Sequence, residues 1–460
     1  MPRRRIALFA DGGFLAHTTR VLEVGRALSR SYGHEVHFCC TGPYSRLLRE
    51  AGFAVHPVYT VDREVTLKLA RRAGLCDLRW WRDVAERSVR SDMEAIAAIG
   101  PDLVVGDLRM SLATSARAAR VPYVAVTNAA WTSRFAEEIQ VPEGHLSERL
   151  LGRRVAQALF PTVKRVLLWY WARGFDGVRK RLALPPLGSL HDLIEGDVTL
   201  LADLPEYFPV KNPPPSFRYV GPIRFREALP RPIWLGRLAK DRPTLYFTMG
   251  SSGDASFFAE AVRVFGGTNY QVLITTAGLP GKLFSQYDNV YVEELADGDS
   301  LMAASHLTIT HGGNGTIYQA LGQGVPVIGI PTMFDQELNL QRVEALGAGL
   351  RLPMRDCRAE RLRAAVETIL GNPAYGESAR RLQRRIAGFD GPRGAALHIE
   401  HFLLTGDPAA RPPEARPETR ELREVRHDLR PEARVAALEA VAVAAEAEAA
   451  LERQALPRAL

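Results

Sequence analysis

The sequence predicts an α/β protein with two doubly wound parallel sheets, each covered by helices on both faces. Short apolar segments alternate with amphipathic helical patterns in both halves of the chain, as in repeated strand–helix–strand units. A proline-rich stretch separates the halves and interrupts the alternation. The 460 residues, of which 46% are hydrophobic and 24% charged, suffice for two such domains.

The first half contains a series of apolar segments that we predict to be buried strands. Apolar runs of this length without alternation are typical of parallel strands covered on both faces. Helical patterns at Thr18–Ser31 and Trp80–Ile99 have the length of crossover helices. The predicted strands are RIALFA (from Arg5), EVHFCC, FAVHPV, DLVVGD, PYVAVTN, VTLLAD and RYVGPI.

Two stretches of this half need separate interpretation. The start, MPRRRIALFADGGF, has the arginines of a secretory signal, but its apolar part is short and Asp11 interrupts it, so we expect a first strand. No run reaches the ~18 uncharged apolar residues of a membrane span. Residues 144–184 are helical in pattern and rich in Arg, Trp and Leu. We favour a helix that packs on the core, with a helix covering a hydrophobic acceptor pocket as the alternative.

The second half repeats the alternation after Asp241 and ends in a segment of different character. Its predicted strands are TLYFTMG, YQVLITT, NVYVEEL, HLTITH and VPVIGIP, with a helix from Asp254 and several helices up to Leu404. We therefore predict an N-terminal domain at 1–208, a linker at 209–240 and a C-terminal domain at 241–404. Residues 405–460 are polar and proline-rich, then alanine-rich, which predicts a tail that is partly disordered and partly helical.

Composition argues against several classes of function. The net charge of +7 is modest, and no basic run is interleaved with aromatic residues, so we expect no nucleic-acid partner. The four cysteines have no zinc spacing, and Cys39 and Cys40 are adjacent in a predicted strand. We expect a reducing, cytoplasmic setting, with peripheral membrane contact left open.

The strongest local motif follows the predicted strand HLTITH. His311, Gly312 and Gly313 turn the chain, and a helix starts at Asn314 or Gly315. Glycines let a ligand approach the backbone closely, and the N–H groups and dipole at a helix start attract anions. Asn314 and Thr316 add side-chain donors. We predict that this turn binds phosphate.

The residues HGGNGTIYQALGQGVPVIGIPTMFDQELNLQRVEALGAG closely resemble the donor-binding box of nucleotide-sugar glycosyltransferases. The family contains macrolide and glycopeptide antibiotic glycosyltransferases and the UDP-glycosyltransferases. The resemblance covers most of residues 1–404 and implies the GT-B fold: two facing Rossmann-like domains with an interdomain cleft. It implies a UDP- or dTDP-linked hexose as co-substrate and no cofactor.

The resemblance also assigns roles to residues of the second half. The turn holds the diphosphate, which implies that role for His311, Gly313, Asn314, Gly315 and Thr316. The remaining donor-binding residues are Asp335 and Gln336 on the sugar hydroxyls, Ser251 and Ser252 on the phosphates, and Leu295 on the base through its backbone. The tryptophan and the "PQ" that precede the box in plant members are missing, so the choice between UDP and dTDP stays open.

Transfer to a hydroxyl needs a group that takes up its proton, and histidine suits that task near neutral pH. His17 follows the first predicted strand at the place of the family's "GHxxP" histidine, although Thr-Thr-Arg follows it here. Asp107, at the end of the fourth predicted strand, is the candidate partner that orients the ring. Two alternatives stay open: Asp107 caps the helix near Ser111, or Asp11 orients His17 instead.

We therefore predict an inverting hexosyltransferase that acts on a hydrophobic small molecule or lipid. The acceptor hydroxyl would enter a pocket of the first half near Trp131, and the helix start and His311 would stabilise the departing diphosphate. No acidic cluster or DxD-like pair marks a metal site. A nucleotide-sugar epimerase and a catalytically silent binding or activator subunit are the alternatives. The acceptor, the sugar and the oligomeric state do not follow from the sequence.

Overall fold

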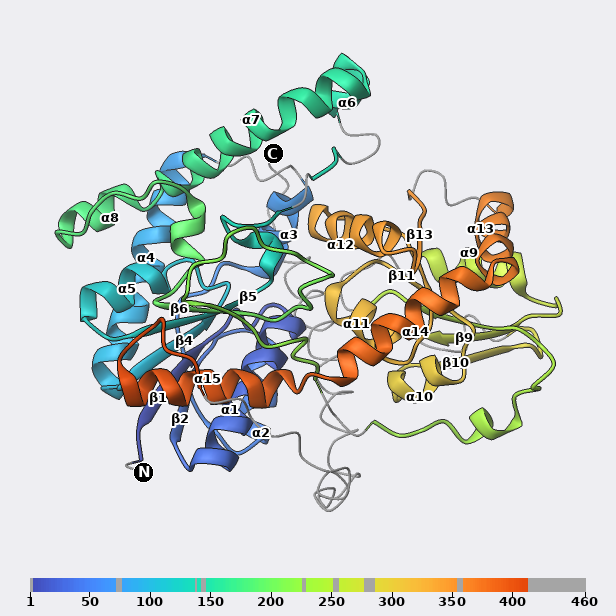
Figure 1. Cartoon of the computed structure of the whole chain (residues 1–460), viewed down its shortest axis with the longest axis horizontal. Helices are drawn as coiled ribbons and strands as arrows, with labels where there is room; N and C mark the ends of the chain where they lie inside the picture. The colour runs from blue at the N-terminus through green and yellow to red at the C-terminus, as the bar shows by residue number, and fades with distance from the viewer. Residues whose placement is uncertain are drawn as a thin grey trace, which may run out of the picture. The chain divides into compact units, whose positions relative to one another are not determined.

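The computed structural model describes residues 3–71, 77–136, 139–141, 146–225, 229–250, 256–276, 286–353 and 359–412. Its contacts divide the chain into two compact units, and each is described by itself. The first unit contains Met1–Phe225, Pro331–Gly347 and Leu382–Ala410, and the second contains Arg226–Ile330 and Ala348–Arg381. The residue colours of Figure 1 identify these segments.

The first unit contains a seven-stranded parallel sheet with the order β3-β2-β1-β4-β5-β6-β7. The central strands β4 and β5 are buried along their whole length, because helices cover both faces of a parallel sheet. The strands are β1 Arg5–Phe9, β2 Glu35–Cys39, β3 Ala54–His56, β4 Leu103–Asp107, β5 Tyr123–Thr127, β6 Val198–Leu201 and β7 Phe217–Tyr219.

The second unit contains a six-stranded parallel sheet with the order β10-β9-β8-β11-β12-β13. Its core is apolar, with Phe247, Phe265 and Ile309 fully buried. The strands are β8 Thr244–Thr248, β9 Gln271–Thr275, β10 Val290–Glu293, β11 Leu307–Thr310, β12 Val327–Gly329 and β13 Gly349–Arg351.

Helices connect the strands, as the alternating pattern predicts. The long helix α4 begins after Asp77, whose carboxylate accepts the N–H groups of Arg79 and Trp80, and ends at Gly100 with φ of 60°. The described helices are α1 Leu15–Tyr32, α2 Ser45–Glu50, α3 Arg63–Arg71, α4 Leu78–Ile99, α5 Leu112–Ala119, α6 Leu146–Leu151, α7 Arg153–Ala172, α8 Asp176–Arg181, α9 Ser256–Phe265, α10 Gly298–Ala303, α11 Asn314–Gly322, α12 Phe334–Ala345, α13 Ala359–Gly371, α14 Pro373–Ala387 and α15 Gly391–Thr405.

Helix α15 returns to the first unit and packs alongside α1 (Figure 1). A buried polar contact fastens it there, with His34 Nε2 lying 2.6 Å from a carboxylate oxygen of Glu400. Beyond the helix, the Arg218 guanidinium donates to the carbonyl groups of Pro408, Ala409 and Ala410. These contacts join the end of the described chain to the first sheet.

The observed elements confirm the predicted fold class of two parallel-sheet α/β domains. Each predicted strand is present and is shortened at one or both ends, except that β7 begins one residue before the predicted segment, at Phe217, whereas β13 was not predicted. Residues 146–184 form α6, α7 and α8, and α7 packs on the core with one face only. No helix within the described residues combines the length and apolarity needed to cross a bilayer. The tail prediction for 405–460 lies mostly outside the described residues, which end at 412.

Candidate active site

Helix α1 carries His17 in its first turn, just beyond the carboxyl end of β1. The turn before it packs tightly against the loop that follows β2. A Cβ atom on Gly12 would lie 2.4 Å from the carbonyl oxygen of Thr41, and Gly42 has φ of 133°. Glycine at positions 12 and 42 therefore allows the loops after β1 and β2 to pack closely beside the start of α1, where His17 lies.

The carboxylate of Asp107 lies beside the His17 ring. His17 Nδ1 is 3.3 Å from Asp107 Oδ1, although the ring N–H is not aligned well enough to count as a hydrogen bond. Arg20, one turn further along α1, donates to the same oxygen at 3.1 Å. Asp107 is fully buried, whereas 24% of the His17 side chain is exposed. The Arg20 guanidinium and the titratable His17 ring therefore share one carboxylate oxygen.

The environment of His17 favours its protonated form. Burial lowers the pKa of His17, but the charge and proximity of Asp107 outweigh burial and raise the pKa above its ordinary value of 6.5, while Arg20 lowers it. A histidine with this pKa takes up a proton readily near neutral pH. The pair has the chemistry of a general base with an orienting carboxylate.

The geometry distinguishes the two aspartates, although the charge of Asp11 also raises the pKa of His17. The Asp11 carboxylate accepts the N–H of Gly13 at 2.9 Å. The Asp107 carboxylate, in contrast, lies 3.3 Å from Nδ1 of the His17 ring. Asp107 does not cap helix α5, whose N-cap residue is Ser111. Leu108, directly after Asp107, has φ of 49°, a strained conformation for a residue with a side chain.

Sequence patterns do not single out Arg20, yet its side chain connects several strand ends. Its second guanidinium nitrogen donates to Asn128 Oδ1 at 3.1 Å. Asn128 in turn donates to Asp203 Oδ1 at 3.0 Å. Asn128 follows β5 and Asp203 follows β6, so the network connects the carboxyl ends of β4, β5 and β6 to α1.

Helix α12 carries Asp335 and Gln336 and belongs to the first unit. Burial raises the pKa of Asp335, while backbone N–H groups and the nearby charge of His17 lower it. Gln336 is buried, and its Oε1 accepts the N–H of Thr332 at 2.8 Å. Its Nε2 has no hydrogen-bond partner within the described residues. The first unit thus brings Asp335 within electrostatic reach of His17.

In the second unit, His311 follows β11 and is covered by glycines. A Cβ atom would lie 2.6 Å from the His311 ring on Gly250 and 2.5 Å on Gly313. The ring is buried, and its Nδ1 lies 3.2 Å from Thr310 Oγ1. Burial lowers the pKa of His311 to about 4. The ring is therefore neutral at pH 7 and can stabilise an anion through an N–H group, not through a full charge.

Helix α11 begins at Asn314, and its N-cap Gly313 supplies no side-chain cap. The first N–H groups of a helix have no intrahelical acceptors and form an anion site. A Cβ atom on Gly315 would meet nothing within 4 Å, although glycine weakens a helix compared with alanine. A larger side chain would therefore fit at position 315, and the packing of the structure does not explain why glycine is present there. Thr316, one residue further, also lies in the first turn of α11.

Other predicted site residues are less informative. Ser251 and Ser252 lie outside the described residues. Leu295 is partly buried in the turn between β10 and α10. Trp131 closes a short 3₁₀ helix after β5 and packs on the cluster around Trp81.

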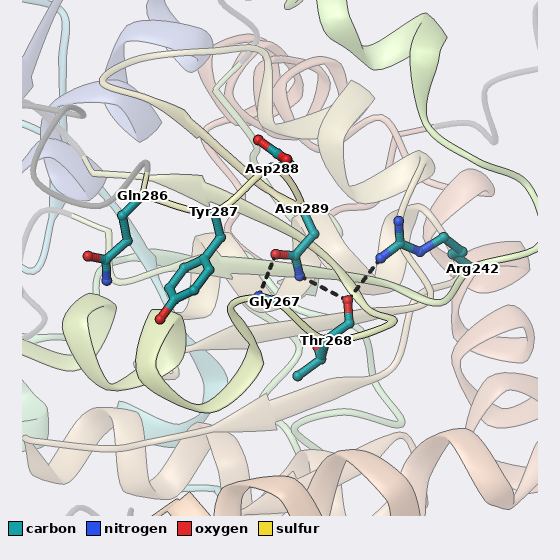
Figure 2. A pocket seen from close by; sticks show the side chains of 7 residues that line it. All are labelled: Arg242, Gly267, Thr268, Gln286, Tyr287, Asp288 and Asn289. Carbon is teal, nitrogen blue, oxygen red and sulfur yellow. Dashed lines mark hydrogen bonds between the residues drawn. The ribbon is translucent and has the colours of Figure 1, made fainter.

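One cavity of about 360 Å³ lies in the second unit, at the amino ends of β9 and β10. This edge is opposite to the HGG turn, which follows the carboxyl end of β11. Figure 2 shows Asn289 facing Gly267 and Thr268 in this cavity; its side chain accepts the Gly267 N–H at 2.8 Å. The polar groups there hold loops together. Within the described part of the chain, no three His, Cys, Asp or Glu side chains are grouped to hold a metal.

Comparisons with known proteins agree on the family. The family described as "Erythromycin biosynthesis protein CIII-like, C-terminal domain" matches residues 272–400. A PGL/p-HBAD biosynthesis glycosyltransferase of Mycobacterium tuberculosis (strain H37Rv) is 33% identical over 406 residues, covering 87% of this chain and 92% of the relative. A PGL/p-HBAD biosynthesis rhamnosyltransferase of Mycobacterium bovis (strain BCG) is 33% identical over 404 residues, covering 87% and 88%.

Solved structures of low sequence identity show the same fold. The calicheamicin glycosyltransferase CalG4 superposes with a TM-score of 0.66 at 22% identity, covering 88% of this chain and 99% of that one. The spinosyn rhamnosyltransferase SpnG, complexed with thymidine diphosphate, gives 0.60 at 17% identity, covering 86% and 99%. Together with the identity to the mycobacterial relatives over most of their length, the fold shows that this chain belongs to the family of GT-B glycosyltransferases and is itself a sugar-transferring enzyme.

Proposed function

We propose that the enzyme transfers a hexose from a nucleoside-diphosphate sugar to a hydroxyl of a hydrophobic acceptor, with inversion at the anomeric carbon. The observation that carries this proposal is the Asp107 carboxylate 3.3 Å from His17 Nδ1, with Asp335 within electrostatic reach. The proposed base and the proposed sugar-binding carboxylate therefore belong to the same unit.

His17 acts as the general base in this proposal. Its Nδ1 faces Asp107, which leaves Nε2 to accept the proton of the acceptor hydroxyl. The acceptor oxygen forms a bond to the anomeric carbon as the bond to the diphosphate breaks, and the proton remains on His17. Asp107 stabilises the resulting imidazolium. One such displacement inverts the anomeric configuration.

The donor's diphosphate is proposed to bind at the start of α11. The helix dipole and the N–H groups there favour an anion, and the open space beside Gly315 leaves room for close approach. Gln336 Nε2, a buried donor without a partner in the described residues, suits a sugar oxygen. Because this fixed positive end stabilises the leaving group, we also propose that transfer needs no divalent metal, which EDTA treatment tests.

The nucleotide is proposed to be thymidine diphosphate and the sugar a rhamnose-like deoxyhexose. One relative is named a rhamnosyltransferase, and SpnG is a rhamnosyltransferase complexed with thymidine diphosphate. The acceptor pocket is proposed near Trp131. We place the enzyme in the cytoplasm; the free, buried thiols of Cys39 and Cys40 are compatible with a reducing compartment.

The test compares wild type with His17→Ala in two assays. Transfer or hydrolysis of UDP- and dTDP-sugars is measured first, and binding of the free nucleoside diphosphate is measured by calorimetry. We expect His17→Ala to lose about 10²–10⁴-fold in turnover and to bind the nucleotide as wild type does. Unchanged turnover would exclude His17 as the base, and NMR of the product's anomeric proton tests inversion.

A further inference from the structure

Helices α6 and α7 carry most of the large apolar side chains that the described residues expose. Of eleven such side chains, seven lie on these two helices. Leu150 is 72% exposed, Val166 57% and Trp169 50%. The seven are Leu150, Leu151, Val155, Leu159, Val163, Val166 and Trp169. Exposed apolar groups concentrated in this way mark an interaction surface.

The exposed residues of α7 form one continuous stripe. Val155, Leu159 and Val166 are spaced by one or two helical turns, which places them on one side of the helix. The opposite side of α7 packs against other parts of the first unit. There, Phe160 contacts Phe334 with ring centroids 6.3 Å apart, and Trp171 packs on the cluster around Trp81. The helix is therefore apolar on two sides, and only one of them covers the core.

Positive charge is concentrated on the same segment. Helices α6 and α7 together carry five Lys and Arg residues and one acidic residue, an excess that is more than half of the net charge of +7 of the whole chain. Arg154 and Arg165 are both exposed. They are three helical turns apart and so flank the apolar stripe on the same side.

The end of α7 combines an aromatic ring with a cation. The Arg173 guanidinium lies over the Trp169 ring, 5.0 Å from its centroid. Tryptophan and arginine are enriched where proteins meet the lipid–water interface, because each has an apolar body and a polar or charged end. A helix with a basic flank and an apolar stripe lies in the plane of an anionic membrane.

We propose that α6 and α7 form a docking surface for an anionic phospholipid bilayer, with the outer stripe of α7 in the headgroup region. Charge complementarity selects this occupant, because a second copy of the chain would bring the same excess of positive charge to the interface. The surface places the first unit at a membrane. The proposal of lipid binding does not depend on the proposed function, since lipid binding requires no sugar transfer.

The first experiment is cosedimentation of the full chain with vesicles of phosphatidylglycerol and phosphatidylcholine, or of phosphatidylcholine alone. We expect binding to the anionic vesicles, little binding to the neutral ones, and weaker binding as salt is raised. A variant with Val155, Leu159, Val166 and Trp169 each changed to Ser should bind at least about tenfold more weakly. The matched control is Ile233→Ser, which removes an exposed apolar side chain outside the two helices.

A second variant keeps the proposal testable if the serine variant does not fold. Arg154→Glu with Arg165→Glu leaves the apolar stripe intact, and about fivefold weaker binding to anionic vesicles is expected for each reversed charge, or more. Sedimentation velocity measures self-association in parallel. Failure of the wild-type chain to bind anionic vesicles overturns the proposal. Dimers that dissociate when the stripe is changed, without any lipid binding, assign the surface to a second copy instead.

Discussion

Arg20 and His17 contact the same oxygen of Asp107. The guanidinium donates to Oδ1 at 3.1 Å, and His17 Nδ1 lies 3.3 Å from that atom. The other carboxylate oxygen is buried without a hydrogen-bond partner in the described residues. Asp107 therefore attracts both the permanently charged Arg20 and His17, whose charge depends on pH. Substitutions of Arg20 and of Asp107 should shift the pKa of His17, the proposed base, in opposite directions.

Removing the charge of Arg20 should move the acid limb of the pH–rate profile to higher pH. The Arg20 charge lowers the pKa of His17, so Arg20→Gln raises it, and the base then becomes deprotonated only at higher pH. The measurement is kcat/KM from pH 5 to pH 9. Arg26→Gln on the same helix is the control, because Arg26 pairs with Glu23 at 2.6 Å. A profile identical to wild type would contradict the shared carboxylate.

Asp107→Asn should shift the same limb in the opposite direction. Burial lowers the pKa of His17, but Asp107 raises this pKa by more than burial lowers it. Neutralising Asp107 should therefore lower the pKa of His17. The imidazolium also loses its stabilising charge, and we expect the maximal rate to fall by about 10²–10⁴-fold. Nucleotide binding measured by calorimetry should stay unchanged. An unshifted limb with a normal rate would show that Asp107 is structural.

The fold followed from the sequence because its strands are continuous apolar runs. β4 and β5 are buried along their whole length, and such segments are recognisable without tertiary information. β13 was missed because Gly349–Arg351 is only three residues long and contains a glycine and an arginine. Pairing with β12 makes it a strand, and no local pattern encodes that pairing.

The site was predicted only as far as residue types at strand ends allow. Asp11 and Asp107 both end a strand, so their order along the chain could not decide between them. The choice depends on side-chain direction, since Asp11 bonds the N–H of Gly13. The sequence analysis did not single out Arg20. Its contact with Asp107 arises from residues 87 positions apart, which periodicity does not reveal.

Gly315→Ala should separate packing from ligand binding. A Cβ atom at Gly315 meets nothing within 4 Å, so the variant should fold and gain about 0.5–1 kcal/mol of helix stability. If diphosphate binds against this backbone, the methyl group should weaken nucleotide binding by about tenfold or more.

The matched control is Gly371→Ala, whose Cβ also meets nothing within 4 Å and which ends helix α13. Calorimetry with thymidine diphosphate and with UDP measures binding, and urea unfolding measures stability. Equal affinity in wild type and Gly315→Ala would remove the start of α11 from the donor site. Loss of folding would instead contradict the open space beside Gly315.

Buried His311 should make the second unit less stable in acid. Burial lowers its pKa from 6.5 to about 4, so between these values the unfolded chain binds a proton that the folded chain does not. The free energy of unfolding therefore falls as pH decreases from 6.5 to 4, by about 2 kcal/mol at pH 5 relative to pH 7.5. His311→Asn should remove this part of the pH dependence.

The measurement is urea unfolding at pH 7.5 and pH 5, followed by hydrogen exchange of β11 so that the second unit is observed by itself. The variant's starting stability is different from that of wild type, so the comparison uses the change between the two pH values and not either value alone. From pH 7.5 to pH 9 both proteins should respond equally, because His311 is neutral in both folded and unfolded chains there. Equal losses at pH 5 would mean that the folded protein accommodates a charged His311, and the ring would then be able to offer a full positive charge to the departing diphosphate.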